Sequence, residues 1–198
     1  MNLPPEALPW IRVHRTHIDA DDLRASYKAS LAEDYRMILP FLPVHSENIL
    51  DIGCGMAGID LFLYIHYRKK VHLQLMDGTG DTAVKFGFNA QLNPYNHMGI
   101  TQKFLSMNQV DARHIHMHPI DPEKTIPCDL IISLLSWGFH YPAGTYCALA
   151  KRSLKSGGIL VLDIRKGTDY DCLQENFIFR QKIYEREGKV ERIVFQAY

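Results

Sequence analysis

The pattern of apolar and polar positions predicts a chain that alternates between strands and helices. Short apolar runs, which are typical of buried strands, are separated by longer segments in which apolar residues recur every three or four positions. We expect strands at 48–52, 71–76, 114–120, 129–135 and 158–164, and helices at 59–69, 82–91, 100–109 and 143–154. Repeated strand–helix–strand units predict a mainly parallel sheet that is covered by helices on both faces.

The N-terminal part of the chain departs from this alternation. Residues 1–18 carry three prolines, which predict an extended arm with Trp10 and Ile11 as its anchors. A helix is expected over 19–39, because its apolar residues lie three or four positions apart and prolines follow it. We therefore expect an N-terminal arm and helix over 1–45, with a possible role as a lid, ahead of a main domain at 46–198.

The C-terminal part also departs from the strand–helix alternation. Residues 177–185 and 190–198 both have strand character and flank a short segment that contains Gly188. Two strands joined by a turn of this kind predict an antiparallel hairpin. Such a hairpin at the end of a parallel sheet is a narrower signal than the alternation alone.

Composition and charge exclude several classes of protein. The chain has 198 residues, 46% of them apolar, and its formal net charge is zero. No apolar run approaches the roughly 20 residues of a membrane span, the first residues lack the pattern of a signal peptide, and a neutral chain has no strong general attraction for nucleic acid. The four cysteines form no Cys-x-x-Cys pair. We expect a soluble, cytoplasmic protein, with no membrane partner and with nucleic acid disfavoured.

A glycine-rich loop follows the first strand of the main domain. Gly53, Gly55 and Gly58 lie where that strand passes into a helix. Glycines let the backbone turn sharply and approach a ligand, and the helix start offers free N–H groups to an anion. The spacing matches the dinucleotide-binding fingerprint, with Asp77 about 20 residues further on to bind a ribose. A nicotinamide cofactor is therefore one interpretation.

Three features favour S-adenosylmethionine (SAM) over a dinucleotide. Asp51 lies two residues before the first glycine, where a carboxylate can meet the ammonium group of this ligand. The loop also comes after about 50 residues and an amphipathic helix, whereas dinucleotide-binding domains usually open with it. Too little chain remains beyond residue 165 for a separate substrate domain.

From about residue 45 to 198, the sequence resembles the class I SAM-dependent methyltransferases. The resemblance rests on Ile-Leu-Asp-Ile-Gly-Cys-Gly at 49–55, on Asp77, on Leu-Lys-Ser-Gly-Gly at 154–158, and on the closing hairpin. It implies an α/β fold with a doubly wound, mostly parallel seven-stranded sheet and a C-terminal antiparallel hairpin. The family's third loop glycine usually comes two residues after the second, where this chain has Ala57 before Gly58.

The resemblance also implies which residues contact the cofactor. Asp77 would hold the ribose hydroxyls, and Asp121 could accept a hydrogen bond from the adenine amino group, although capping and turn roles are alternatives for these two aspartates. We expect the cofactor, SAM, to be bound by residues of the glycine loop and of three strand ends, namely Asp51, Gly53, Cys54, Gly55, Gly58, Asp77, Gly78, Asp121 and Ser136.

The segment 136–142 follows the fourth strand of the main domain, where this family places catalytic residues. It is loosely similar to bacterial sugar O-methyltransferases and lacks the pattern of enzymes that methylate nucleic-acid amines. His140 is the candidate base, because imidazole titrates near neutral pH, and a purely structural role is the alternative. We expect the substrate to contact aromatic residues of this loop and a cation after the fifth strand, namely Trp137, Phe139, Tyr141 and Arg165.

Alternating histidines raise the question of a metal. His114, His116 and His118 would share one face of a strand, but without an evident acidic partner we expect them on an edge strand and expect no metal. The sequence thus predicts a SAM-dependent methyltransferase that acts on a small-molecule hydroxyl, with a sugar as one candidate acceptor. The alternatives are an RNA or protein acceptor, an NAD-dependent oxidoreductase, and a SAM-binding module without catalysis.

Overall fold

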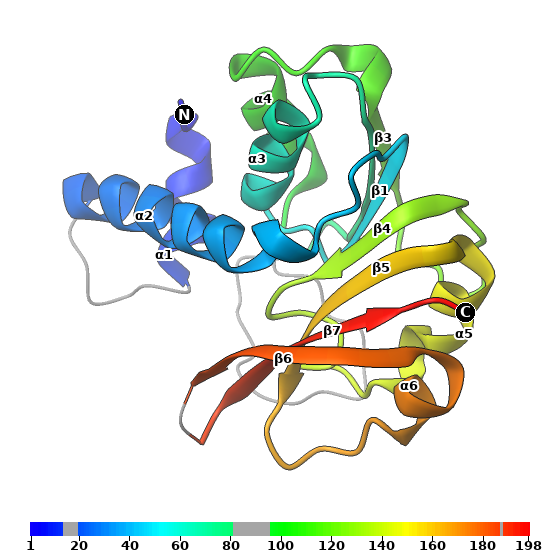
Figure 1. The fold of residues 1–198 in the computed structure, drawn as a ribbon. Helices are drawn as coiled ribbons and strands as arrows, with labels where there is room; N and C mark the ends of the chain where they lie inside the picture. Colours follow the sequence, from blue (N-terminus) through cyan, green and yellow to red (C-terminus); the bar gives the residue numbers. More distant parts are fainter. Residues whose placement is uncertain (14–19, 81–95, 187) are drawn as a thin grey trace.

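A single seven-stranded sheet forms the centre of the protein (Figure 1). The computed structural model describes residues 1–13, 20–80, 96–186 and 188–198. The strand order is β3-β2-β1-β4-β5-β7-β6, in which β1 to β5 are parallel and β7 is antiparallel to both β5 and β6. The strands are β1 (Asn48–Ile52), β2 (His72–Met76), β3 (Ile115–His118), β4 (Cys128–Ser133), β5 (Leu154–Arg165), β6 (Ile178–Arg186) and β7 (Val190–Gln196).

Helices cover both faces of this sheet, as the alternating pattern predicts (Figure 1). One face packs against α2 (Ala20–Ile38), α3 (Gly58–His66) and α4 (Met98–Met107), and the other against α5 (Gly144–Ser153) and α6 (Asp171–Asn176). Strand β1 serves both cores, because Ile49 points to the first and Leu50 and Ile52 to the second. A strand buried on both faces is mostly apolar, and the apolar residues Ile49, Leu50 and Ile52 explain why the pattern located β1 so well.

The predicted fold class is confirmed, and two details of the prediction are wrong. Residues 1–13 are not an extended arm: a 3-10 turn (Pro5–Ala7) and α1 (Leu8–Val13) form there, since proline is tolerated in the first turn of a helix. His114 ends a 3-10 turn instead of lying on β3, so the three alternating histidines do not share one strand. The predicted helix at 82–91 lies outside the described residues.

The N-terminal segment is built into the first core. Trp10 and Ile11 are buried, as expected for anchors. Helix α2 packs against α3 so closely that a Cβ atom on Gly58 would lie 2.5 Å from both Tyr27 Oη and Leu31 Cδ1. Gly58 therefore lies at the contact between the two helices. The division at residue 45 and the lid role of 1–45 remain predictions. No helix in the described ranges has the length and apolar character needed to cross a membrane.

A buried ion-pair network joins the N-terminal helix to the far half of the sheet. Arg192 on β7 donates through Nε and Nη2 to the two carboxylate oxygens of Asp163 on β5, at 2.6 and 3.0 Å. Its Nη1 reaches Asp34 of α2 at 2.8 Å. Burial raises the pKa of Asp163, and the hydrogen bonds from Arg192 oppose that rise. The two-pronged geometry compensates for removing both charges from water.

We expect Arg192→Met to destabilise the fold strongly, because it leaves Asp163 buried without its cation. Breaking a buried ion pair typically costs about 3–5 kcal/mol, which urea unfolding followed by circular dichroism would measure. The matched control is Lys182→Met, which removes an exposed lysine that is paired with Glu185 and Glu191 on the outer two strands. The control should unfold close to the wild-type midpoint, and equal losses in both variants would contradict this account.

Candidate functional site

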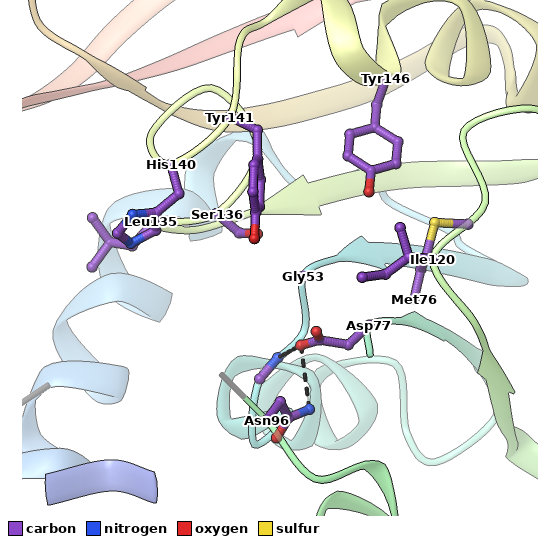
Figure 2. A pocket seen from close by; sticks show the side chains of 11 residues that line it. Gly53, Met76, Asp77, Asn96, Ile120, Leu135, Ser136, His140, Tyr141 and Tyr146 are labelled. Atoms are coloured by element: carbon purple, nitrogen blue, oxygen red, sulfur yellow. Dashed lines mark hydrogen bonds between the residues drawn. The ribbon is translucent and has the colours of Figure 1, made fainter. Parts of the chain in front are cut away.

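A pocket opens at the carboxyl ends of β1, β2 and β4, where ligands bind in sheets of this kind (Figure 2). Figure 2 shows Asp77 and Asn96 on one side of the space and the aromatic side chains of Tyr141 and Tyr146 on the other. The lining consists of backbone from the glycine loop together with apolar, aromatic and acidic side chains, namely Gly53, Gly55, Met76, Asp77, Asn96, Ile120, Leu135, Ser136, His140, Tyr141 and Tyr146.

The glycine loop has a backbone path that favours glycine. Gly53 and Gly55 have positive φ angles of 76° and 52°. Gly53 also lies directly beneath Ser136, since a Cβ atom there would be 1.8 Å from Ser136 Oγ. A Cβ on Gly55 would meet nothing within 4 Å, so the backbone of this glycine is open to a ligand. Ala57 is left-handed as well, with φ of 54°, although it carries a side chain.

Asp77, at the end of β2, fixes the glycine loop from the neighbouring strand. Its Oδ2 accepts hydrogen bonds from Gly55 N at 2.8 Å and from Asn96 Nδ2 at 3.2 Å, and its Oδ1 accepts one from Gly78 N at 2.7 Å. Burial raises the pKa of Asp77 to about 6, while the bonds from Gly78, Gly55 and Asn96 favour the charged form. Asp77 thus stays mostly ionised at neutral pH, and its Oδ1 retains capacity for a ligand donor.

A second set of contacts ties this corner to α4. Thr101 Oγ1 donates to Gly55 O at 2.8 Å and lies 3.3 Å from Asn96 Oδ1. Both Thr101 and Asn96 are buried. The glycine loop is therefore held from two sides, by the carboxylate at the end of β2 and by the hydroxyl on α4.

The loop after β4 is attached to β5. Leu135 begins it with a positive φ of 56° and donates its N–H to Asp163 Oδ2 at 3.2 Å. Further along, Arg165 donates its backbone N–H to Gly138 O and its Nε to Phe139 O, both at 2.9 Å. The Arg165 guanidinium also lies 4.5 Å from the centre of the Phe139 ring. The side chains of Asp163 and Arg165 thereby set the path of this loop.

His140 and Tyr141 project from this loop toward the pocket (Figure 2). The His140 backbone N–H donates to Ser136 O at 2.8 Å, which closes a helical turn over Ser136 to His140. The imidazole packs edge-on against Phe139, with ring centres 4.9 Å apart. Tyr146 comes from α5, and burial raises the pKa of its phenol. An imidazole and two phenols can therefore meet a ligand in the same pocket.

The pocket brings together six of the residues that the sequence predicted, namely Gly53, Gly55, Asp77, Ser136, His140 and Tyr141. Gly78 is adjacent and bonds to Asp77. Phe139 and Arg165, which were predicted to contact the substrate, contact each other instead. The Arg165 guanidinium binds the carbonyl oxygen and the ring of Phe139.

Other predicted residues lie away from the pocket lining. Trp137 is completely buried and donates Nε1–H to Ala143 O at 2.8 Å, so it supports the loop from within the core. The Asp121 side chain accepts from Glu123 N at 3.0 Å, as an ordinary turn aspartate does. Cys54, Asp51 and Gly58 are all buried around the glycine loop.

Five residues of the lining were not predicted from the sequence: Met76, Asn96, Ile120, Leu135 and Tyr146. Three of them had a usable signal, because Met76 ends β2 and Ile120 and Leu135 follow β3 and β4 closely. Asn96 and Tyr146 had none, since one follows a long connection and the other lies on a helix.

The histidines at the β3 edge pair with polar residues of β2. His116 Nε2 lies 2.9 Å from His72 Nδ1, and His118 Nε2 lies 2.8 Å from Gln74 Oε1. Strand β3 is an edge strand, as expected. Across the described ranges, no group of three or more His, Cys, Asp or Glu side chains has the arrangement of a metal site.

Comparison with known proteins places the fold without identifying a close relative. No protein-family model matches the chain. A search of curated protein sequences likewise gave no match.

Among solved structures, magnesium protoporphyrin IX methyltransferase (ChlM) from Synechocystis PCC 6803, with bound SAM, is similar with a TM-score of 0.60 and 13% identity over 96% of this chain and 90% of that one. A protein from Nostoc punctiforme PCC 73102 described as an O-methyltransferase has a TM-score of 0.61 and 10% identity over 95% of this chain and 60% of that one. The pyocyanin biosynthetic protein PhzM has a TM-score of 0.59 and 11% identity, over 94% and 61%. The chain has the fold of the class I SAM-dependent methyltransferases.

Proposed function

We propose that this protein is a SAM-dependent methyltransferase that methylates a hydroxyl group of a small molecule. The observation that carries the proposal is the pocket itself. The glycine loop, the acidic end of β2 and a histidine-bearing loop after β4 line one cavity at the carboxyl edge of a sheet with the methyltransferase strand order. One fold can support many functions, so the residues that line the pocket, and not the fold, carry the proposal.

The residues present fit SAM. Asp77 Oδ1 would accept from a ribose hydroxyl, and the open backbone at Gly55 leaves room for the ligand beside the loop. Met76, Ile120 and Leu135 provide apolar surface in the same pocket, as an adenine ring requires. Bound SAM supplies an electrophilic methyl group, and this chain's task is to orient the acceptor, exclude water and remove its proton.

His140 is the proposed base of the reaction. Its ring lines the pocket, and its orientation is set by Phe139 and by the backbone bond to Ser136. A neutral imidazole can take the proton of an acceptor hydroxyl as the oxygen becomes nucleophilic. Tyr141 and Tyr146 would wall the space, which favours a transfer that disperses charge. A sugar hydroxyl is one acceptor of this class.

Two alternatives from the sequence are less well supported. Dinucleotide-binding sheets are parallel with the order 3-2-1-4-5-6, whereas β7 here is antiparallel and lies between β5 and β6. An RNA acceptor would call for a cationic track, and the pocket lining contains no lysine or arginine among the described residues. A SAM-binding module without catalysis is separated from an enzyme by the second experiment below.

The cofactor assignment predicts micromolar binding of SAM and of S-adenosylhomocysteine, and none of NAD, in calorimetric titration. Gly53→Ala should weaken SAM binding about tenfold or more, because a left-handed backbone costs a non-glycine residue roughly 1–2 kcal/mol and the new methyl would collide with Ser136. Gly144→Ala is the control, since its Cβ has open space around it. Thermal melts would verify that both variants are folded, and NAD binding by the wild type would refute the assignment.

The base assignment predicts that His140→Ala lowers turnover by about 10²-fold or more while SAM still binds. Turnover is measured as S-adenosylhomocysteine formed with a panel of sugars and other hydroxyl compounds. With SAM at saturation, the wild-type rate should fall at acid pH, where a protonated imidazole cannot accept a proton, and the residual rate of the variant should not follow this profile. The control is His45→Ala, an exposed histidine just before β1. A loss below tenfold at position 140 would leave His140 a structural residue.

A further inference from the structure

Two carboxyl groups lie together beneath the glycine loop, outside the pocket lining. Asp51 is on β1 and faces the same side as Ile49, toward α3, and Asp60 is in the first turn of α3. Asp51 is 3% exposed and Asp60 is fully buried. The two carboxyl groups interact electrostatically, since each changes the pKa of the other.

Three of the four carboxyl oxygens of this pair lack the donors that buried carboxylates need. Asp51 Oδ1 and both carboxyl oxygens of Asp60 accept no hydrogen bond among the described residues. Two ionised groups in this position would repel each other in a dry environment, which is costly. A proton held by one carboxyl group supplies the missing donor, so the pair is satisfied when it shares one proton. Consistent with this, burial raises the pKa of Asp60 to about 6 and that of Asp51 well above its usual value, with the charge of Asp60 adding to the latter.

The surroundings of the pair add negative charge. Asp77, across the loop, raises the pKa of Asp51, and the buried thiol of Cys54 has its own pKa raised by burial and by all three aspartates. Tyr27 of α2 packs over Gly58. Arg192 is a buried cation on this face, and its guanidinium is bound to Asp163 and Asp34. Among the described residues, no lysine or arginine forms an ion pair with Asp51, Asp60 or Asp77.

We propose that Asp51 and Asp60 act as one proton-sharing unit that recognises positive charge at the glycine loop, and that a cationic ligand in the pocket expels the shared proton to solvent. This inference rests on the proposed function, because SAM carries an ammonium and a sulfonium group. Occupation of the pocket favours the doubly ionised pair, and the O–H bond of one carboxylic acid breaks as its proton passes to the buffer. The positive end of α3 stabilises the charge left on Asp60.

The sign of the effect follows from linkage. Burial raises the pKa of both carboxyl groups, so the free protein holds the shared proton to a higher pH than ordinary aspartates would. A bound cation makes that proton easier to lose, so SAM affinity should fall as the pH falls. The decrease approaches tenfold per pH unit when one proton is released for each ligand bound. S-adenosylhomocysteine lacks the sulfonium charge, so its binding should release less of the proton than SAM binding does.

The test is calorimetric titration with SAM at pH 6 in buffers of different ionisation enthalpy, which counts protons released on binding. We expect the wild type to release clearly more protons than Asp60→Asn, whose amide can donate to an ionised Asp51. The release that remains in the variant comes from Asp77, whose pKa burial also raises to about 6. The SAM affinity of the variant should change less between pH 5.5 and 7.5 than that of the wild type. The matched control is Asp129→Asn at the opposite end of the sheet, where Lys155 holds the carboxylate ionised, and its proton release should equal that of the wild type.

The outcomes separate this inference from the proposed function. If the wild type and Asp60→Asn both bind SAM and release equal numbers of protons, the inference is overturned while the proposed function stands. The released proton would then come from Asp77. A wild type that binds no SAM at any pH overturns the proposed function and this inference together. Should the variant fail to fold, carbon NMR of the Asp60 carboxyl group in the wild type gives the answer. SAM should lower its pKa, and an unchanged value overturns the inference.

Discussion

The ion pair between Arg192 and Asp163 is the interaction on which much of the rest depends. Charges buried in a sheet are retained only when each finds its partners, and here the partners lie on different elements. Arg192 joins β7 to α2 through Asp34, while Asp163 joins β5 to the loop after β4 through the N–H of Leu135. A single guanidinium thus fixes the N-terminal helix, the antiparallel strand and one wall of the pocket in relation to one another.

The pocket arises between two loops that are each held by a neighbouring strand. Asp77 holds the glycine loop from β2, and Asp163 and Arg165 hold the histidine-bearing loop from β5. The crevice between them is therefore shaped by side chains that hydrogen bonds within the protein hold in place. Pre-organised sites of this kind spend little binding energy on ordering loops.

The sequence predicted the fold and about half of the pocket lining, for physical reasons that differ between residues. Gly53 and Asp77 were found because a strand end followed by glycine or an acid is a local signal. Trp137 was expected to face the substrate, yet its indole is buried in the second core. The sequence could not show this, because a loop has no periodicity that distinguishes buried from exposed positions. Asn96 reaches Asp77 only through the tertiary fold. In the sequence, Asp60 looks like an ordinary acidic residue in the first turn of a helix. Only the structure shows that it is buried and interacts with Asp51.

The order of the last two strands has a consequence for how the chain assembles during synthesis. Strand β6 pairs with β7 alone, and β7 is the strand that joins it to β5. The ribosome therefore makes β6 before the strand that brings it into the sheet. Asp34 and Arg192 are likewise separated by 158 residues in the sequence, so their ion pair can form only after Arg192 has been synthesised. Contacts so distant in sequence form late, so the nascent protein carries an unpaired strand and an unneutralised acid until its final strand has emerged.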